Sequence, residues 1–132
     1  MFGVTTQLSA QQRVDKGRVA CIGHPRYMAM AGIIMMQKYE VVDNPDMTAC
    51  TNGRDVKFGR QFVESLTDAE LRFLILHECY HMIFKHLITW KHLWDKSRTR
   101  ANHACDFTIN GKLVDENRQD GFAKMPAVGV YD

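Results

Sequence analysis

The sequence lacks the features of a secreted or membrane protein. Its cysteines form no Cys-x-x-Cys pair and stand far apart, at Cys21, Cys50, Cys79 and Cys105. No apolar run among the 132 residues is long enough to cross a bilayer, and the first residues do not resemble a secretory signal. We therefore expect free thiols, no membrane association and a cytoplasmic location.

An excess of charge of one sign is also lacking. Lys and Arg total 17 against 15 Asp and Glu, a net charge of +2, which by itself gives no argument for a nucleic-acid partner. Positive charge is concentrated in residues 85–100, where Asp95 is the single acidic residue. The basic residues and histidines of this stretch are Lys85, His86, Lys91, His92, Lys96, Arg98 and Arg100. We interpret this stretch as solvated surface, and contact with nucleic acid through it is the less favoured alternative.

The remaining composition is that of a globular protein. Hydrophobic residues make up 45% of the chain and charged residues 24%. A chain of this length is expected to form one domain, residues 1–132, with one modest core.

The most apolar stretch contains a metal-binding motif. Residues 71–86 read LRFLILHECYHMIFKH, without Gly or Pro, and follow a capping box made by Thr67 and Glu70. This pattern predicts a helix that is buried on most of its circumference. Residues 77–81 match H-E-x-x-H. Residues four apart on a helix lie about 40° apart around its axis, so both imidazoles can reach one ion.

The residue types of the motif indicate a zinc hydrolase. His77 and His81 are of the type that binds zinc, and the carboxylate of Glu78 beside them can take a proton from a metal-activated water. The alternative is a satisfied polar cluster in the core, since unpaired buried polar groups are costly. We predict one Zn²⁺ per chain and a peptidase that hydrolyses peptide bonds of a protein or peptide substrate, with Glu78 as general base.

A catalytic zinc needs a third protein ligand and an open position. The best candidate is Asp106 on a second predicted helix, 100–113, where polar residues form a narrow stripe: Asn102, His103, Asp106 and Asn110. The stripe contains no Lys or Glu, which favours the wall of a site over a solvent face. We expect Asn110 or Asn102 to hold the carboxylate of Asp106, although both could instead cap the helix.

Three histidines stay open as alternatives for the third ligand. His103 lies on the same stripe as Asp106. His86 points about 180° away from His77 on a continuous helix. His92 returns to the right face but lies about 16 Å beyond His81, and we expect a bend or break near residues 89–90 because the helix would otherwise be long for this domain.

Two further helices are expected before the motif. Residues 8–19 read as a weakly amphipathic helix, and the pair His24-Pro25 should interrupt the chain, because a residue before proline is disfavoured in the α region. Residues 26–38 follow as a second helix. Its run of methionines is typical of a core-facing stripe rather than of a binding surface.

Strands are expected between these helices and the motif. Residues 39–42 alternate as a short strand, and Asn52-Gly53 between 48–51 and 55–58 indicates a β-hairpin. Residues 56–58 could be an edge strand that pairs with an extended peptide, or a strand that only covers the motif helix.

Three segments within residues 47–113 resemble a known family. They read TACTNGRDVKFGRQFV, LTDAELRFLILHECYHMIFKH and NHACDFTIN, of which the H-E-x-x-H and the Asp-x-x-Ile-Asn at 106–110 are the specific parts. The family is the zinc metallopeptidase domain that occurs in phage proteins and, in bacteria, often N-terminal to a von Willebrand A-like domain. A phage-encoded member would work in the host cytoplasm.

The resemblance implies a zincin-like α+β fold, in which a long motif helix and a second site helix pack with a small sheet or β-hairpin. It also implies His77 and His81 as zinc ligands, Glu78 as catalytic base, and Asp106 and Asn110 as site residues. Members often carry a histidine where His86 stands here.

Two other functions remain open. The first is a protease like the SprT group, which acts on DNA-bound proteins; His92 would then be the third ligand and residues 85–100 would meet nucleic acid. The second is a non-catalytic, zinc-stabilised protein-binding module, in which the metal holds the fold together and Glu78 has no chemical role.

Overall fold

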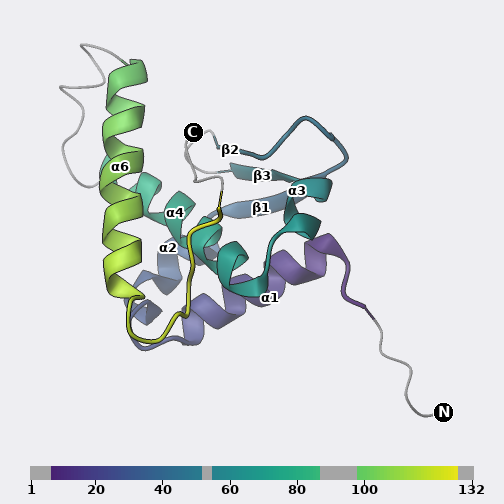
Figure 1. The fold of residues 1–132 in the computed structure, drawn as a ribbon, viewed down its shortest axis with the longest axis horizontal. Helices are drawn as coiled ribbons and strands as arrows, with labels where there is room; N and C mark the ends of the chain where they lie inside the picture. Colours follow the sequence, from purple (N-terminus) through teal and green to yellow (C-terminus); the bar gives the residue numbers. More distant parts are fainter. Residues whose placement is uncertain (1–6, 52–54, 87–97, 128–132) are drawn as a thin grey trace.

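The computed structural model describes residues 7–51, 55–86 and 98–127, and of residues 84–86 and 98–105 it describes the backbone alone. The predicted α+β class is confirmed: helices pack together with a small sheet that lies toward one side of the molecule (Figure 1). In chain order the elements are α1 (Ala10–Gly23), the 3₁₀ helix η1 (Met28–Met30), α2 (Ala31–Met36), β1 (Lys38–Val42), β2 (Ala49–Thr51), β3 (Asp55–Gly59), α3 (Arg60–Ser65), α4 (Asp68–His86) and α6 (Arg98–Glu116).

The first predicted helix is present and longer than expected. Ser9 caps α1 through a capping box with Gln12, in which each side chain accepts from the backbone N–H of the other residue. The helix ends at Gly23, and His24 is extended because it precedes Pro25. The interruption predicted at this position is therefore confirmed.

The second predicted helix differs from the expectation. A short 3₁₀ turn and the six-residue α2 replace one continuous helix over 26–38. Ile34 is the residue of α2 that enters the core, whereas Met28, Met35 and Met36 are 56%, 68% and 60% exposed. Placing this methionine run in the core was wrong, because α2 is short and rests on the core by one narrow face.

The sheet has the order β1-β3-β2. β2 and β3 pair antiparallel, as the hairpin predicts, while β1 pairs with β3 in parallel. Of the two alternatives for residues 56–58, the edge strand is wrong: Val56 lies opposite both Tyr39 of β1 and Thr51 of β2, so β3 is the central strand. Val56 and Phe58 turn into the core, and the edges of this sheet are β1 and β2.

The motif helix α4 lies in the middle of the molecule, with α1 and α6 packed against it (Figure 1). Its predicted capping box is confirmed: Thr67 N–H donates to Glu70 Oε1, and Glu70 N–H donates to Thr67 Oγ1. Leu71 and residues 73–76 of α4 are buried together with Cys79, and Ile109 and Leu113 of α6 join the same core. The predicted second site helix is thus present, and the expected bend near 89–90 lies outside the described residues.

The C-terminal segment returns along α4 after α6 ends. Lys124 N–H donates to the carbonyl of Ala69 at 3.0 Å, and Arg72 Nε donates to the carbonyl of Phe122 at 2.6 Å. Among the described residues no single helix is long and apolar enough to cross a membrane; the pair Ala10–Gly23 and Met28–Met36, bent by 116°, passes that test together by length and composition alone.

Candidate metal centre

The crossing of α4 and α6 brings together two imidazoles and a carboxylate. His77 and His81 come from successive turns of α4, and Asp106 comes from the facing side of α6. The two Nε2 atoms lie 3.0 Å apart, and Asp106 Oδ1 lies 3.2 Å from Nε2 of His77 and 2.6 Å from Nε2 of His81. All three side chains are at most 1% exposed.

The tautomer of His77 is set by a neighbour on α6. Nδ1 of His77 lies 2.8 Å from Oδ1 of Asn110. With the amide oxygen as acceptor, Nδ1 carries the proton, and Nε2 presents its lone pair to His81 and Asp106. This is the arrangement in which a metal-binding histidine is held by an outer partner.

The donor set fits a divalent metal ion. Zinc ligands at about 2.0–2.2 Å in a tetrahedral arrangement lie about 3.3–3.6 Å from one another. Two of the three separations, 3.0 Å and 3.2 Å, are near this spacing, and the third, 2.6 Å, is shorter. Two imidazole nitrogens and one carboxylate oxygen are donors that zinc accepts well. Among the described residues, His77, His81 and Asp106 form the one group of this kind that could hold a metal ion.

Glu78 lies between the two histidines in sequence and is 1% exposed. Its backbone carbonyl accepts from Nε2 of Gln37 at 3.5 Å, and Oε1 of Gln37 accepts from the Tyr39 hydroxyl at 2.6 Å. Burial raises the pKa of Tyr39, so this hydroxyl keeps its proton and acts as the donor. The chain entering β1 is thereby tied to the motif turn of α4.

Tyr80 and Glu116 form a second contact between the two site helices. The Tyr80 hydroxyl donates to Glu116 at 3.0 Å and 3.1 Å from its two oxygens, and the Tyr27 hydroxyl donates to the same carboxylate at 3.1 Å. Burial raises the pKa of Tyr80, with the charge of Glu116 acting in the same direction. These contacts place Tyr80 in the packing between the two site helices.

Sequence reasoning did not foresee all of these partners. It expected Asn110 or Asn102 to hold the carboxylate of Asp106, and it did not foresee the contact of the Asn110 amide with the ring of His77. Glu116 was missed, and no local motif marks it. The side chains of His86, Asn102 and His103, and the whole of His92, lie outside the described residues, so the structure does not compare them with Asp106.

Comparison with known proteins supplies the family. A search of curated proteins finds no match to this chain. A family model described as "Putative metallopeptidase domain" matches residues 11–130, a span that contains both site helices and the sheet. The match covers far more than half of the 132 residues. The chain therefore belongs to this metallopeptidase domain family.

Proposed function

We propose that the protein is a zinc-dependent peptidase whose metal ligands are His77, His81 and Asp106 and whose general base is Glu78. The observation that carries the proposal is the convergence of three donor atoms within 3.2 Å of one another, with the buried Glu78 directly after His77 on the same helix. Membership in a metallopeptidase family supports the same reaction class.

In this proposal each residue has a separate task. When bound, the metal supplies Lewis acidity, which polarises a peptide carbonyl and makes a water easier to deprotonate. Glu78 takes the proton of the attacking water and passes it to the leaving nitrogen. Asn110 keeps the proton of His77 on Nδ1, so that Nε2 stays available to the metal.

A second candidate is a metal-stabilised module that binds a protein partner without catalysis. The observation that favours it is burial: the three donors and Glu78 are each at most 1% exposed. Structural zinc sites are closed, whereas catalytic sites keep one position open to water or substrate. Under the peptidase proposal, the chain around the cluster must move to admit a peptide.

Metal content, cleavage and a conservative variant together test the peptidase. We expect one zinc per wild-type chain, loss of zinc in His81→Ala and at least a tenfold weaker site in Asp106→Ala. Glu78→Gln should keep the zinc and lose cleavage of a mixed peptide library by at least 100-fold. A folded wild-type protein that takes up zinc and cleaves nothing, with Glu78→Gln indistinguishable from it, would favour the binding module.

A further inference from the structure

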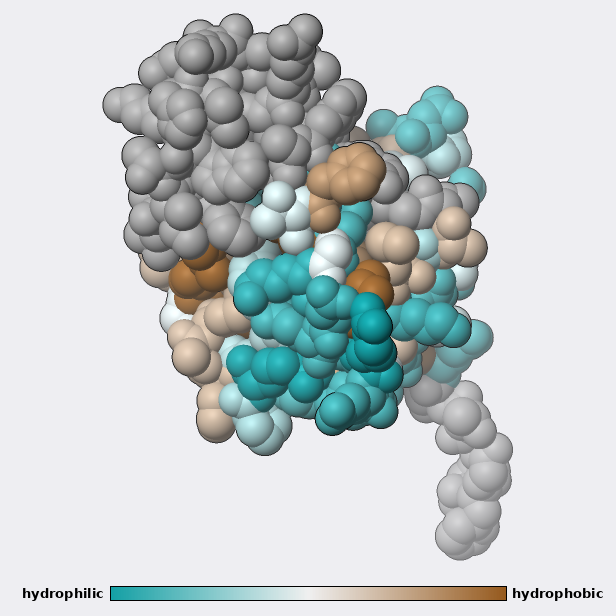
Figure 2. Space-filling model, turned by 60° about the vertical axis from the view of Figure 1, so that its left-hand side comes forward, coloured by the Kyte–Doolittle hydropathy of each residue, from teal (hydrophilic) through white to brown (hydrophobic). Residues whose placement is uncertain are grey.

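A cavity opens on the outer side of α6, close to the metal centre. Its volume is about 300 Å³, and we call it the α6 cavity; its lining consists of Phe107, Asn110, Gly111, Val114, Asp115 and Met125. Figure 2 turns the side of the molecule that carries α6 toward the viewer and shows apolar side chains grouped beside a hydrophilic area. Phe107 is 73% exposed, and Val114 and Met125 are also exposed.

The α6 cavity adjoins the candidate metal centre through one shared residue. Phe107 follows Asp106 directly in the chain, and both belong to the same helix. Asn110 belongs to both places, because it lines the cavity and its Oδ1 lies 2.8 Å from Nδ1 of His77. Asn110 is therefore the side chain that lies between the cavity and His77.

Gly111 is the most informative residue of the lining. It lies inside the 19-residue α6, where glycine costs about 1 kcal/mol relative to alanine. A Cβ atom built on it would meet nothing within 4 Å, so packing does not require glycine here. Its backbone does not require glycine either, because the positive φ among the described glycines is at Gly121. What the missing side chain provides is room in the cavity.

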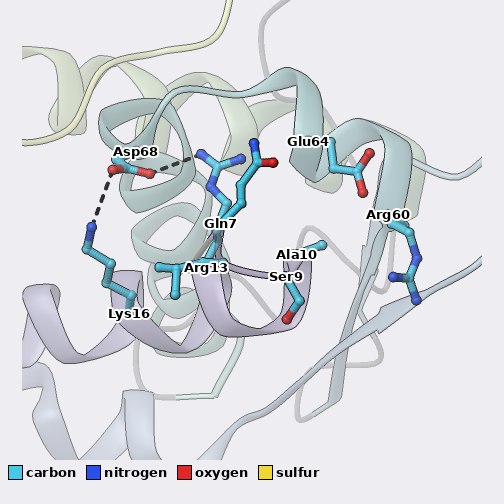
Figure 3. Close-up of a pocket in the computed structure, with 9 residues that line it drawn as sticks. Gln7, Ser9, Ala10, Arg13, Lys16, Arg60, Glu64 and Asp68 are labelled. Carbon is cyan, nitrogen blue, oxygen red and sulfur yellow. Dashed lines mark hydrogen bonds and ion pairs between the residues drawn. The ribbon is translucent and has the colours of Figure 1, made fainter. Parts of the chain in front are cut away.

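A second cavity, at the start of α1, lacks this character. Its volume is about 690 Å³. Charged side chains in its lining form ion pairs with one another: Arg13 and Lys16 both contact Asp68, at 3.0 Å and 3.7 Å (Figure 3). Arg13 also donates to the carbonyls of Val63 and Leu66, which closes the end of α3. These contacts account for Arg13, Lys16 and Asp68 without a ligand.

We propose that the α6 cavity is the specificity pocket of the peptidase and receives one large apolar side chain, such as Leu, Met or Phe, beside the scissile bond. The proposal rests on the proposed peptidase function. The volume is at the lower end for a ligand pocket, so it fits a side chain rather than a whole cofactor. Asp115 is paired with Arg118 at 2.5 Å, so the edge of the cavity carries no unbalanced charge, and selection rests on apolar contact.

Filling the cavity tests the proposal. Gly111→Met places a side chain in the cavity at a position that has space for it and where helix propensity improves. We expect wild-type cleavage sites in a mixed peptide library, read by mass spectrometry, to be enriched in Leu, Met and Phe on one side of the cut bond. Gly111→Met should lower kcat/KM for a leucine peptide about 10- to 100-fold more than it lowers kcat/KM for the glycine analogue.

The matched control is Gly32→Met. Gly32 is also a helical glycine whose Cβ would meet nothing within 4 Å, but it lies on α2. Its cleavage pattern should equal that of the wild type. Cleavage without apolar preference, or with a preference that Gly111→Met does not alter, would overturn the pocket and leave the peptidase standing.

A binding measurement separates failure of the pocket from failure of catalysis. Acetyl-leucinamide and its polar counterpart acetyl-asparaginamide are titrated into the wild type and Gly111→Met, with amide shifts of 106–116 observed by NMR. We expect shifts with the leucine probe alone, and none in Gly111→Met. Such binding without any peptide cleavage would contradict the peptidase while keeping the cavity as an apolar binding site; no binding in the wild type would contradict the cavity itself.

Discussion

Asn110 is the residue whose role is most sharply defined by a single contact. Its Oδ1 accepts from Nδ1 of His77, and this fixes which nitrogen can face a metal. We expect Asn110→Ala to weaken zinc affinity about 10- to 100-fold, the usual cost of losing an outer partner of a ligand. A chelator competition titration measures the change.

Asn110→Asp is the matched variant for this prediction. A carboxylate at the same position still accepts from Nδ1, so zinc affinity should stay within a few-fold of the wild type. If Asn110→Ala binds zinc as tightly as the wild type, the contact with Asn110 does not orient His77 for the metal.

At the level of elements, neighbouring backbone leaves no room for a side chain at Gly59, the last residue of β3. A Cβ there would lie 2.0 Å from the carbonyl oxygen of Met47 and 3.2 Å from that of Asn44. Its φ of −69° suits any residue, so the obstacle is purely steric. We expect Gly59→Ala to lower the free energy of unfolding by about 3 kcal/mol, as measured by urea denaturation, because backbone must move.

Gly32→Ala provides the comparison. Its Cβ would meet nothing within 4 Å, so the substitution should leave stability unchanged or raise it by about 0.5–1 kcal/mol through helix propensity. Equal stability of the two variants would show that Met47 and Asn44 yield to the added methyl group without loss.

The elements also show which features of the structure can be predicted from the sequence. Helix α4 and its capping box were predictable because the signals lie within a few residues of one another, at Thr67 and Glu70 and along the apolar run. The central place of β3 was not, because it depends on the parallel pairing of Tyr39 with Val56, which no local pattern encodes. The Asn110–His77 and Tyr80–Glu116 contacts likewise depend on how α4 crosses α6.

At the scale of the whole molecule, Asp120 joins the C-terminal segment to the turn after α1. It accepts from Phe122 N–H, His24 and Arg26. These hydrogen bonds lower the pKa of Asp120 to about 2, and the bond from Phe122 N–H has the largest effect. The pKa in an unfolded chain is about 4. A depressed pKa stabilises the fold above about pH 4, and this contribution is lost as the pH falls from about 4 to about 2.

Asp120→Asn should therefore unfold more easily than the wild type at pH 7, and the difference should vanish at about pH 2. Urea denaturation of both proteins across this range gives the comparison. A difference in stability that stays constant down to pH 2 would mean that the charge of Asp120 contributes nothing. The loss in Asp120→Asn would then come only from the poorer hydrogen-bond geometry of the amide.

Metal removal tests how far the whole fold depends on the candidate centre. At a free zinc concentration of about 1,000 times the Kd, binding to the folded chain raises the free energy of unfolding by about 4 kcal/mol. This corresponds to a rise in Tm of about 10 °C or more for a domain of this size. We expect this rise in the wild type and in Glu78→Gln, its reversal by a chelator, and its absence in His81→Ala. A rise that persists in His81→Ala would place the metal elsewhere.

The chelated protein then separates the two proposed functions. A structural metal is a condition of folding, so its removal unfolds the chain. Here the apolar core runs from α1 through the sheet to α4 and α6 and includes Val14, Phe58, Leu74 and Leu113, all fully buried and independent of the three donors. We therefore expect the metal-free protein to stay folded with a lower Tm, which is the behaviour of a catalytic site. Loss of the circular dichroism of a folded protein on chelation would instead make the metal structural and favour the binding module.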